Sequence, residues 1–173
     1  MHILVTAASK YGSTAATADR IAEELRGAGH EVTQRPPGEV TSLTGIDAVI
    51  LGSAVYAGTW LPDARDLAHR LEAELLRRGV WLFSSGPLGD PRERVEDVHV
   101  TSVATAVGAY DHRVFPGAVD PAVLDGDDRA TIEGLHAPVG DFRDWTAVDA
   151  YAHEIAKGLV SRDVVPAPTT TPA

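Results

Sequence analysis

The sequence predicts an α/β fold in which a doubly wound parallel β-sheet carries helices on both faces. Short apolar runs that end in turn residues alternate along the chain with segments whose apolar residues recur at helical spacing. Residues 47–53 contain an uninterrupted apolar run, which is typical of a central strand that is covered on both faces. In such a sheet the loops at the carboxyl ends of the strands carry the ligand site.

Eight elements can be placed from these patterns. Strands are expected over residues 2–6, 31–34, 47–53, 80–84 and 112–115. Helices are expected over residues 13–28, 63–77 and 144–159. The second helix has Leu67, Leu71 and Leu75 at four-residue spacing, and Pro62 precedes it where proline is favoured.

The composition indicates one domain over residues 1–160 and a Pro/Thr-rich tail over residues 161–173 that we expect to be disordered. Of the 173 residues, 44% are hydrophobic and 23% are charged, as in a soluble globular protein. A net charge of −10 argues against nucleic acid as a partner, because binding a phosphate backbone needs clustered basic residues. The sequence has neither a secretory signal nor an apolar run that could span a membrane, so we expect a cytoplasmic protein.

The absence of cysteine restricts the chemistry that the chain could perform alone. It excludes disulfides, thiolate metal sites, Fe–S clusters and cysteine nucleophiles, so redox chemistry would need a bound cofactor. We expect no metal site, because the histidines lack ligand spacing and the acidic run 125–128 lacks the EF-hand pattern.

The first candidate loop follows the strand over residues 2–6 and leads directly into a helix. Backbone N–H groups at a helix start, together with nearby hydroxyls, can replace the water around a phosphate group. The candidate residues of this loop are Ser9, Lys10, Tyr11, Gly12, Ser13 and Thr14. Gly12 would let the chain come close to the ligand. The alternative interpretation is an ordinary strand-to-helix turn with an N-cap, in which Lys10 is simply solvated.

The second candidate loop, over residues 53–62, is apolar and aromatic where a soluble protein normally has polar turn residues. A flat aromatic ligand could cover it by stacking on Tyr56 or Trp60, with Gly58 free to turn its peptide toward a ring nitrogen. The candidate residues are Ala54, Val55, Tyr56, Ala57, Gly58 and Trp60. Alternatively, both aromatic side chains pack over the end of a helix.

The third candidate loop follows the strand over residues 80–84 and is again small and apolar. Its backbone amides could contact the polar edge of a ring system, although an ordinary Gly-Pro turn would explain the sequence equally well. The candidate residues are Ser84, Ser85, Gly86, Pro87 and Leu88.

Together the three loops resemble those of the flavodoxin family. The resemblance rests on the spacing Ser9-x-x-Gly12-x-Thr14, on the run 52–58 (Gly-Ser-Ala-Val-Tyr-Ala-Gly), and on Phe-Arg-Asp-Trp at 142–145. It spans residues 2–160, and the sequence is most similar to the flavodoxin-like branch that includes menaquinone-dependent protoporphyrinogen dehydrogenase. One departure is Ala7, where flavodoxins usually have an aromatic residue.

The resemblance implies a flavodoxin-like five-stranded sheet of order 2-1-3-4-5 and non-covalent FMN held by the three loops. The chain would then be an oxidoreductase that passes electrons between the flavin and a quinone, a porphyrinogen or a similar planar substrate. A quinone substrate would be compatible with transient membrane association. The alternatives are an electron carrier that docks to redox partner proteins, and a structural or regulatory role without flavin. Catalytic residues and oligomeric state are not predicted.

Residues 117–140 are expected to decide between enzyme and carrier. This stretch is longer than a typical connection, is rich in aspartate, and could form a lid over a substrate or a partner surface.

Two other classes of protein are excluded by what occupies their key positions. A receiver domain needs acidic residues after the first strand and an aspartate at the end of the third, where this chain has Thr6-Ala7 and Ser53. A serine hydrolase of the α/β class needs a Gly-x-Ser-x-Gly turn, which surrounds neither Ser53 nor Ser85.

Overall fold

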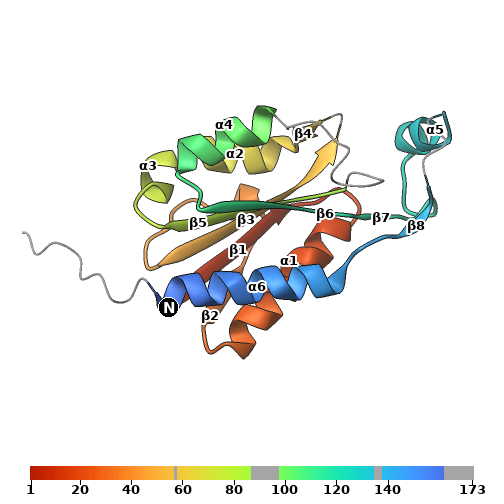
Figure 1. The fold of residues 1–173 in the computed structure, drawn as a ribbon. Coiled ribbons are helices and arrows are strands. Elements are labelled where there is room, and N and C mark those ends of the chain that lie inside the picture. The colour runs from red at the N-terminus through yellow and green to blue at the C-terminus, as the bar shows by residue number, and fades with distance from the viewer. Residues whose placement is uncertain (57, 87–97, 135–137, 162–173) are drawn as a thin grey trace, which may run out of the picture.

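The computed structural model describes residues 1–56, 58–86, 98–134 and 138–161. Its main sheet contains five parallel strands in the order β2-β1-β3-β5-β6 (Figure 1). These strands are β1 (His2–Ala8), β2 (Glu31–Gln34), β3 (Ala48–Tyr56), β5 (Gly79–Ser85) and β6 (Asp111–Phe115). The expected fold is therefore confirmed. The expected strand order 2-1-3-4-5 is confirmed as well, because β5 and β6 are the fourth and fifth of the long strands along the chain. The tail expected over residues 161–173 lies outside the described residues, apart from Ser161.

Helices cover both faces of the sheet, as expected. One face carries α1 (Ser13–Gly27) and α6 (Trp145–Val160). The other face carries α2 (Pro62–Arg70), α3 (Glu72–Leu75) and α4 (Val98–Val107), with the short 3-10 helix η1 (Pro37–Glu39) packed against α2. The helix α4 was not expected from the sequence, because its residues are mostly β-branched and do not form a clear apolar stripe.

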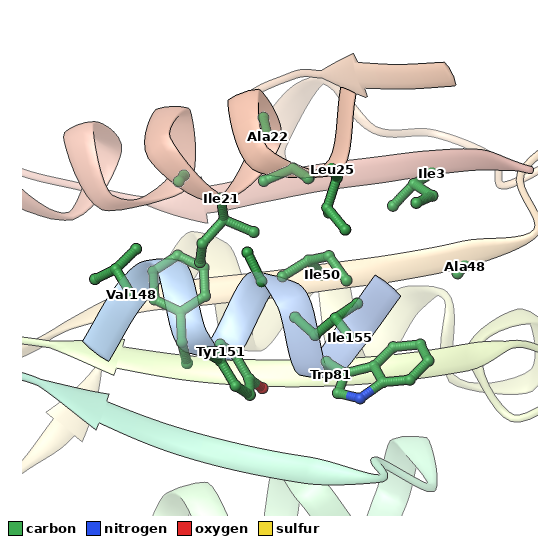
Figure 2. Close-up of a cluster of buried hydrophobic side chains, with 14 of the residues drawn as sticks. Ile3, Ile21, Ala22, Leu25, Ala48, Ile50, Trp81, Val148, Tyr151 and Ile155 are labelled. Atoms are coloured by element: carbon green, nitrogen blue, oxygen red, sulfur yellow. The ribbon is translucent and has the colours of Figure 1, made fainter. Parts of the chain in front are cut away.

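The core beneath α1 and α6 is built from the helical faces that the apolar spacing indicates (Figure 2). Ile21 and Leu25 of α1 and Ile155 of α6 are completely buried against the sheet. Tyr151 lies in the same cluster, and its hydroxyl donates to the carbonyl of Leu82 at 2.8 Å. This buried phenol is therefore satisfied, and its burial raises its pKa far above the usual value.

The helix expected over residues 63–77 is divided into two. Leu71 ends α2 and begins α3, since its N–H bonds to the carbonyl of Leu67 while its own carbonyl accepts from Glu74 and Leu75. Leu67, Leu71 and Leu75 are nevertheless all buried. The four-residue spacing thus predicted the buried face correctly but not the break.

Residues 117–140, called the insertion from here on, leave the main sheet after β6. The insertion begins with β7 (Ala118–Val119) and continues through α5 (Gly126–Gly134). It returns in β8 (Gly140–Asp141), which pairs antiparallel with β7. Figure 1 shows α5 standing beside the sheet rather than packed on either face. None of the residues of α5 is buried.

None of the helices in the described residues combines the length and the apolar character needed to cross a membrane.

The packing at the centre of the sheet predicts the effect of changing Gly52. A Cβ atom at this position would overlap the ring of Phe83, which is fully buried and has no room to move aside. We expect Gly52→Ala to lower the free energy of unfolding by about 1–3 kcal/mol in denaturant titrations. Gly27→Ala is the control, because a Cβ there meets no atom and α1 should become slightly more stable. Equal stability of the two variants would contradict this packing.

Candidate functional site

The loops that follow β1, β3 and β5 meet at the carboxyl edge of the sheet. Register places Ala8 of β1 beside Ser53 of β3, and Ala54 of β3 beside Ser85 of β5. Because the three strands are parallel, their following loops must leave from the same edge. The three loops predicted from the sequence are therefore neighbours in space.

The loop after β1 leaves the start of α1 open to a ligand. Gly12 is the N-cap of α1 with φ 86°, a left-handed conformation that favours glycine. Its N–H bonds to the Ser9 hydroxyl at 3.1 Å, and no side chain among the described residues caps the helix. The first turn carries no acidic residue. An uncapped and uncharged helix start presents N–H donors and the positive end of the helix dipole, which suits a phosphate.

Three side chains of this loop bind the insertion. The Lys10 ammonium lies 2.8 Å from the Asp125 carboxylate and 2.9 Å from that of Asp128. The Tyr11 hydroxyl donates to Asp128 at 2.8 Å and accepts from the Asp125 N–H at 3.3 Å. The Ser13 hydroxyl accepts from the N–H of the first residue of β7 at 2.9 Å.

These contacts alter the expected picture of the loop. Lys10, Tyr11 and Ser13 were predicted as cofactor-binding residues, and that role remains a prediction. In the structure the Lys10 charge is already matched, and it holds the pKa of Asp125 well below its usual range. The donors that remain available at the helix start are mainly backbone N–H groups, beside Ser9 and the buried Thr14.

The loop after β3 is a tight hairpin that places its two aromatic residues on opposite sides. The strand β4 (Thr59–Trp60) pairs antiparallel with the end of β3, with Tyr56 opposite Thr59 and Val55 opposite Trp60. Since side chains alternate along a strand, the pairs 56/59 and 55/60 face opposite sides of the hairpin. Gly58, with φ 76°, makes the turn, and Ala57 lies outside the described residues.

Tyr56 lies at the edge of the site, half-buried. Its ring is 5.8 Å from the Lys10 ammonium, which also lies 5.1 Å from the ring of Tyr11. Burial, with a smaller contribution from Asp128, raises the pKa of Tyr56 to about 12. Tyr56 therefore offers a neutral aromatic surface at this edge over the whole physiological pH range.

Trp60 is part of the core, so the structure does not support its expected place beside a planar ligand. Only 1% of its surface is exposed, and its indole N–H donates to the Ser84 hydroxyl at 2.8 Å. The Ser84 hydroxyl in turn lies 2.8 Å from the Nε2 atom of His112. The alternative packing interpretation describes Trp60 correctly, because the hairpin turns its side chain toward α2 and α4.

Other predicted residues of the second and third loops lie beneath the site. The side chains of Ala54 and Val55 pack inward, so only their backbone could reach a ligand. Gly86 has φ 124° and its N–H bonds to the carbonyl of Phe115 at 3.3 Å. Pro87 and Leu88 lie outside the described residues.

Two buried hydroxyls near this edge have no hydrogen-bond partner among the described residues. They are the Thr6 Oγ1 atom, two residues before the end of β1, and the Oγ atom of Ser85, the last residue of β5. A buried hydroxyl without a partner costs about 1–3 kcal/mol, so each of these two groups calls for a polar partner that the described residues do not supply. Within the described part of the chain no three potential metal ligands gather.

The residues that sequence reasoning missed are Ala118, Asp125 and Asp128. They contact the first loop from more than 100 positions away along the chain. No local pattern could have indicated this pairing, because it depends on where the insertion folds back.

Comparison with known proteins agrees with this geometry. The family model of the flavodoxin domain matches residues 4–144. No curated protein sequence gives a significant match.

Several solved structures share the fold. A flavodoxin from the domain Archaea is 16% identical, with a TM-score of 0.62 over 92% of this chain and 99% of the other. Flavodoxin 2 from Bacillus cereus is 22% identical, with a TM-score of 0.62 over 91% and 99%. Rubredoxin oxygen:oxidoreductase from Desulfovibrio gigas is 16% identical with a TM-score of 0.61; 95% of this chain is covered but only 37% of that protein.

The buried contact of Trp60 predicts different effects for two adjacent serines. Ser84→Ala leaves the indole N–H without its partner, and we expect the free energy of unfolding to fall by about 1–3 kcal/mol. Ser85→Ala is the matched control, because this equally buried hydroxyl has no partner to lose among the described residues. Chemical unfolding of both variants checks this, and a Ser84→Ala protein as stable as Ser85→Ala would contradict the assigned contact.

The raised pKa of Tyr56 predicts that the stability of the fold depends on pH in the alkaline range. Its folded pKa of about 12 lies above the usual value of about 10, so the neutral phenol contributes stability below pH 10. That contribution is lost as the pH rises from about 10 toward 12. Absorbance titration of phenolate should show one tyrosine ionising near pH 12 in the wild type that is missing in Tyr56→Phe. Ionisation of Tyr56 near pH 10 would show that the ring is not held in this environment.

Proposed function

Because the chain belongs to the flavodoxin domain family, we propose that it is an FMN-dependent oxidoreductase that exchanges electrons with a quinone, a porphyrinogen or a similar planar substrate. Members of this family bind FMN, and FMN is the cofactor of this flavin-binding electron-transfer protein. The identity of the substrate and a cytoplasmic location are parts of the proposal.

The residues at the carboxyl edge fit this cofactor. The uncapped start of α1 offers N–H donors for a phosphate, and Tyr56 offers a neutral ring for a flat system. Thr6 and Ser85 hold buried hydroxyls that a polar ligand could satisfy. When bound, the isoalloxazine supplies the electron chemistry, since the chain has no cysteine to do so.

The observation that favours an enzyme over a carrier is the attachment of the insertion to the site. An electron carrier needs only an exposed edge of the isoalloxazine ring, whereas an enzyme needs a substrate pocket that is bounded by protein. Here the insertion contacts the loop after β1 through Lys10, Tyr11 and Ser13, which supports a place for it at the border of the proposed cofactor site. A carrier that docks through acidic residues such as Asp63 is the alternative, supported by the net charge of −10.

Recognition of the phosphate predicts a preference for FMN over riboflavin. Two charge-assisted hydrogen bonds of about 1.5 kcal/mol each amount to about a hundredfold in affinity. Titration followed by flavin fluorescence should therefore give a Kd for FMN about a hundredfold below that for riboflavin. Equal values would contradict the assignment of the loop after β1.

Two glycine variants show whether a loss of FMN affinity comes from the geometry of the loop after β1 or from general backbone strain. Gly12→Ala should weaken FMN binding, because an alanine at φ 86° distorts the helix start. Gly29→Ala, with φ 89° at the opposite end of the same helix, should carry similar strain and leave the Kd for FMN unchanged. Loss of affinity in both variants would mean that the effect comes from destabilisation alone.

Shortening the insertion tests enzyme against carrier. Val119 of β7 pairs with Gly140 of β8, so a two-residue Asn-Gly turn can replace residues 120–139 and keep the contact between Ser13 and β7. The enzyme proposal expects FMN to stay bound and quinone reduction to be lost. Unchanged quinone reduction would instead support the carrier.

A further inference from the structure

The insertion depends on polar contacts to keep α5 beside the cofactor loops. None of the residues of α5 is buried and its one large apolar side chain, Ile132, is only half-buried, so apolar packing contributes little to holding this helix in place. Asp125, just before α5, and Asp128, in its first turn, both bind Lys10. Tyr11 reinforces the same pair by binding the Asp128 carboxylate and the Asp125 N–H. Four contacts from two adjacent loop residues therefore converge on one end of α5.

Lys10 lies where three segments of the site meet. It belongs to the loop after β1, and its ammonium binds the insertion while lying 5.8 Å from the ring of Tyr56 in the loop after β3. The insertion also lies against the loop after β5. Gly117 is so close to Gly86 that a Cβ atom added to Gly117 would lie 2.9 Å from the Cα atom of Gly86. All three cofactor loops are thus in contact, directly or through Lys10, with the insertion.

The insertion carries a strong negative charge to this place. Residues 117–140 contain five acidic side chains and one arginine. Lys10 neutralises only part of the charge on Asp125 and Asp128, and Asp127 lies exposed between them. A wall of this charge next to a substrate site repels an anionic substrate and tolerates a neutral one.

We propose that Lys10 is a positioning residue that fastens the acidic insertion beside the cofactor, and that the insertion thereby selects a neutral quinone over a substrate that carries carboxylates. This inference rests on the proposed function and makes its substrate class more specific. The quinone takes up two electrons and two protons from the reduced cofactor and becomes a quinol. An external reductant of the dithionite class reduces the cofactor again.

The experiment compares two quinones that share a ring system and differ in charge. Reduced FMN-loaded protein is mixed without oxygen with menadione, which is neutral, or with a sulfonated naphthoquinone, which is anionic, and flavin reoxidation is followed. The wild type should have a KM about tenfold or more lower for the neutral quinone. Equal KM values for the two quinones would overturn the proposal.

The variant Lys10→Met distinguishes a positioning role of Lys10 from a purely electrostatic one. The two roles predict opposite changes in the preference for the neutral quinone. If Lys10 fastens the wall, its loss releases α5 and the preference for the neutral quinone falls toward unity, with a higher KM for menadione and little change in kcat. If Lys10 acts only through its charge, its loss makes the site more negative and the preference increases. Lys10→Arg should restore the preference, and Lys157→Met, which changes the only other lysine of the chain, should leave it unchanged.

Hydrogen exchange without FMN tests the fastening independently. Amides of residues 118–134 should exchange faster in Lys10→Met and in the Asp125→Asn/Asp128→Asn double variant than in the wild type. High salt should produce the same effect in the wild type, since these ion pairs are partly exposed to solvent. Unchanged exchange in both variants would overturn the fastening role. Failure of the wild type to bind FMN would instead overturn the proposed function, and the exchange result would still stand.

Discussion

The register of the central strand determines where every part of the site lies. Because β3 pairs with β1 and β5 in parallel, all three strands end at one edge, and β3 extends past Ser53, the partner of Ala8 in β1, to Tyr56 before turning back. Because Gly52 has no side chain, the ring of its neighbour Phe83 in β5 lies close over β3 on the face that α1 and α6 cover. The hairpin that presents Tyr56 and the loop that opens α1 are therefore carried by the most buried part of the fold, as a preorganised site requires.

The loop after β1 divides its groups between two tasks. Its backbone, shaped by Gly12, leaves N–H donors at the start of α1, while Lys10, Tyr11 and Ser13 hold the insertion. Under the proposed function, this division separates recognition of the cofactor from selection of the substrate within a few residues. If this loop binds the phosphate as proposed, its lysine need not face the phosphate, since carboxylates of the insertion already match its charge.

The main sheet and its two largest helices could be predicted because their signals are local. Continuous apolar runs mark buried parallel strands, and apolar spacing marks the buried faces of α1 and α6. Trp60 was misplaced because the two-residue strand β4 gives no sequence signal, and only its pairing with β3 shows which way each side chain faces. The contacts of Lys10 with Asp125 and Asp128 escaped prediction because they join segments more than 100 residues apart. The cofactor family was recognisable from loop spacing, whereas the role of each loop side chain depended on the tertiary structure.

The proposed binding of the FMN phosphate by the backbone at the start of α1 is tested most directly by amide NMR of the labelled protein. On addition of FMN, the N–H signals of residues 10–15 should shift strongly, because these groups exchange water for phosphate oxygens. Riboflavin should leave the same signals nearly unchanged while still shifting those around Tyr56. Equal shifts of the signals of residues 10–15 with FMN and with riboflavin would contradict this mode of binding, as would FMN-induced shifts at the amino ends of the strands instead.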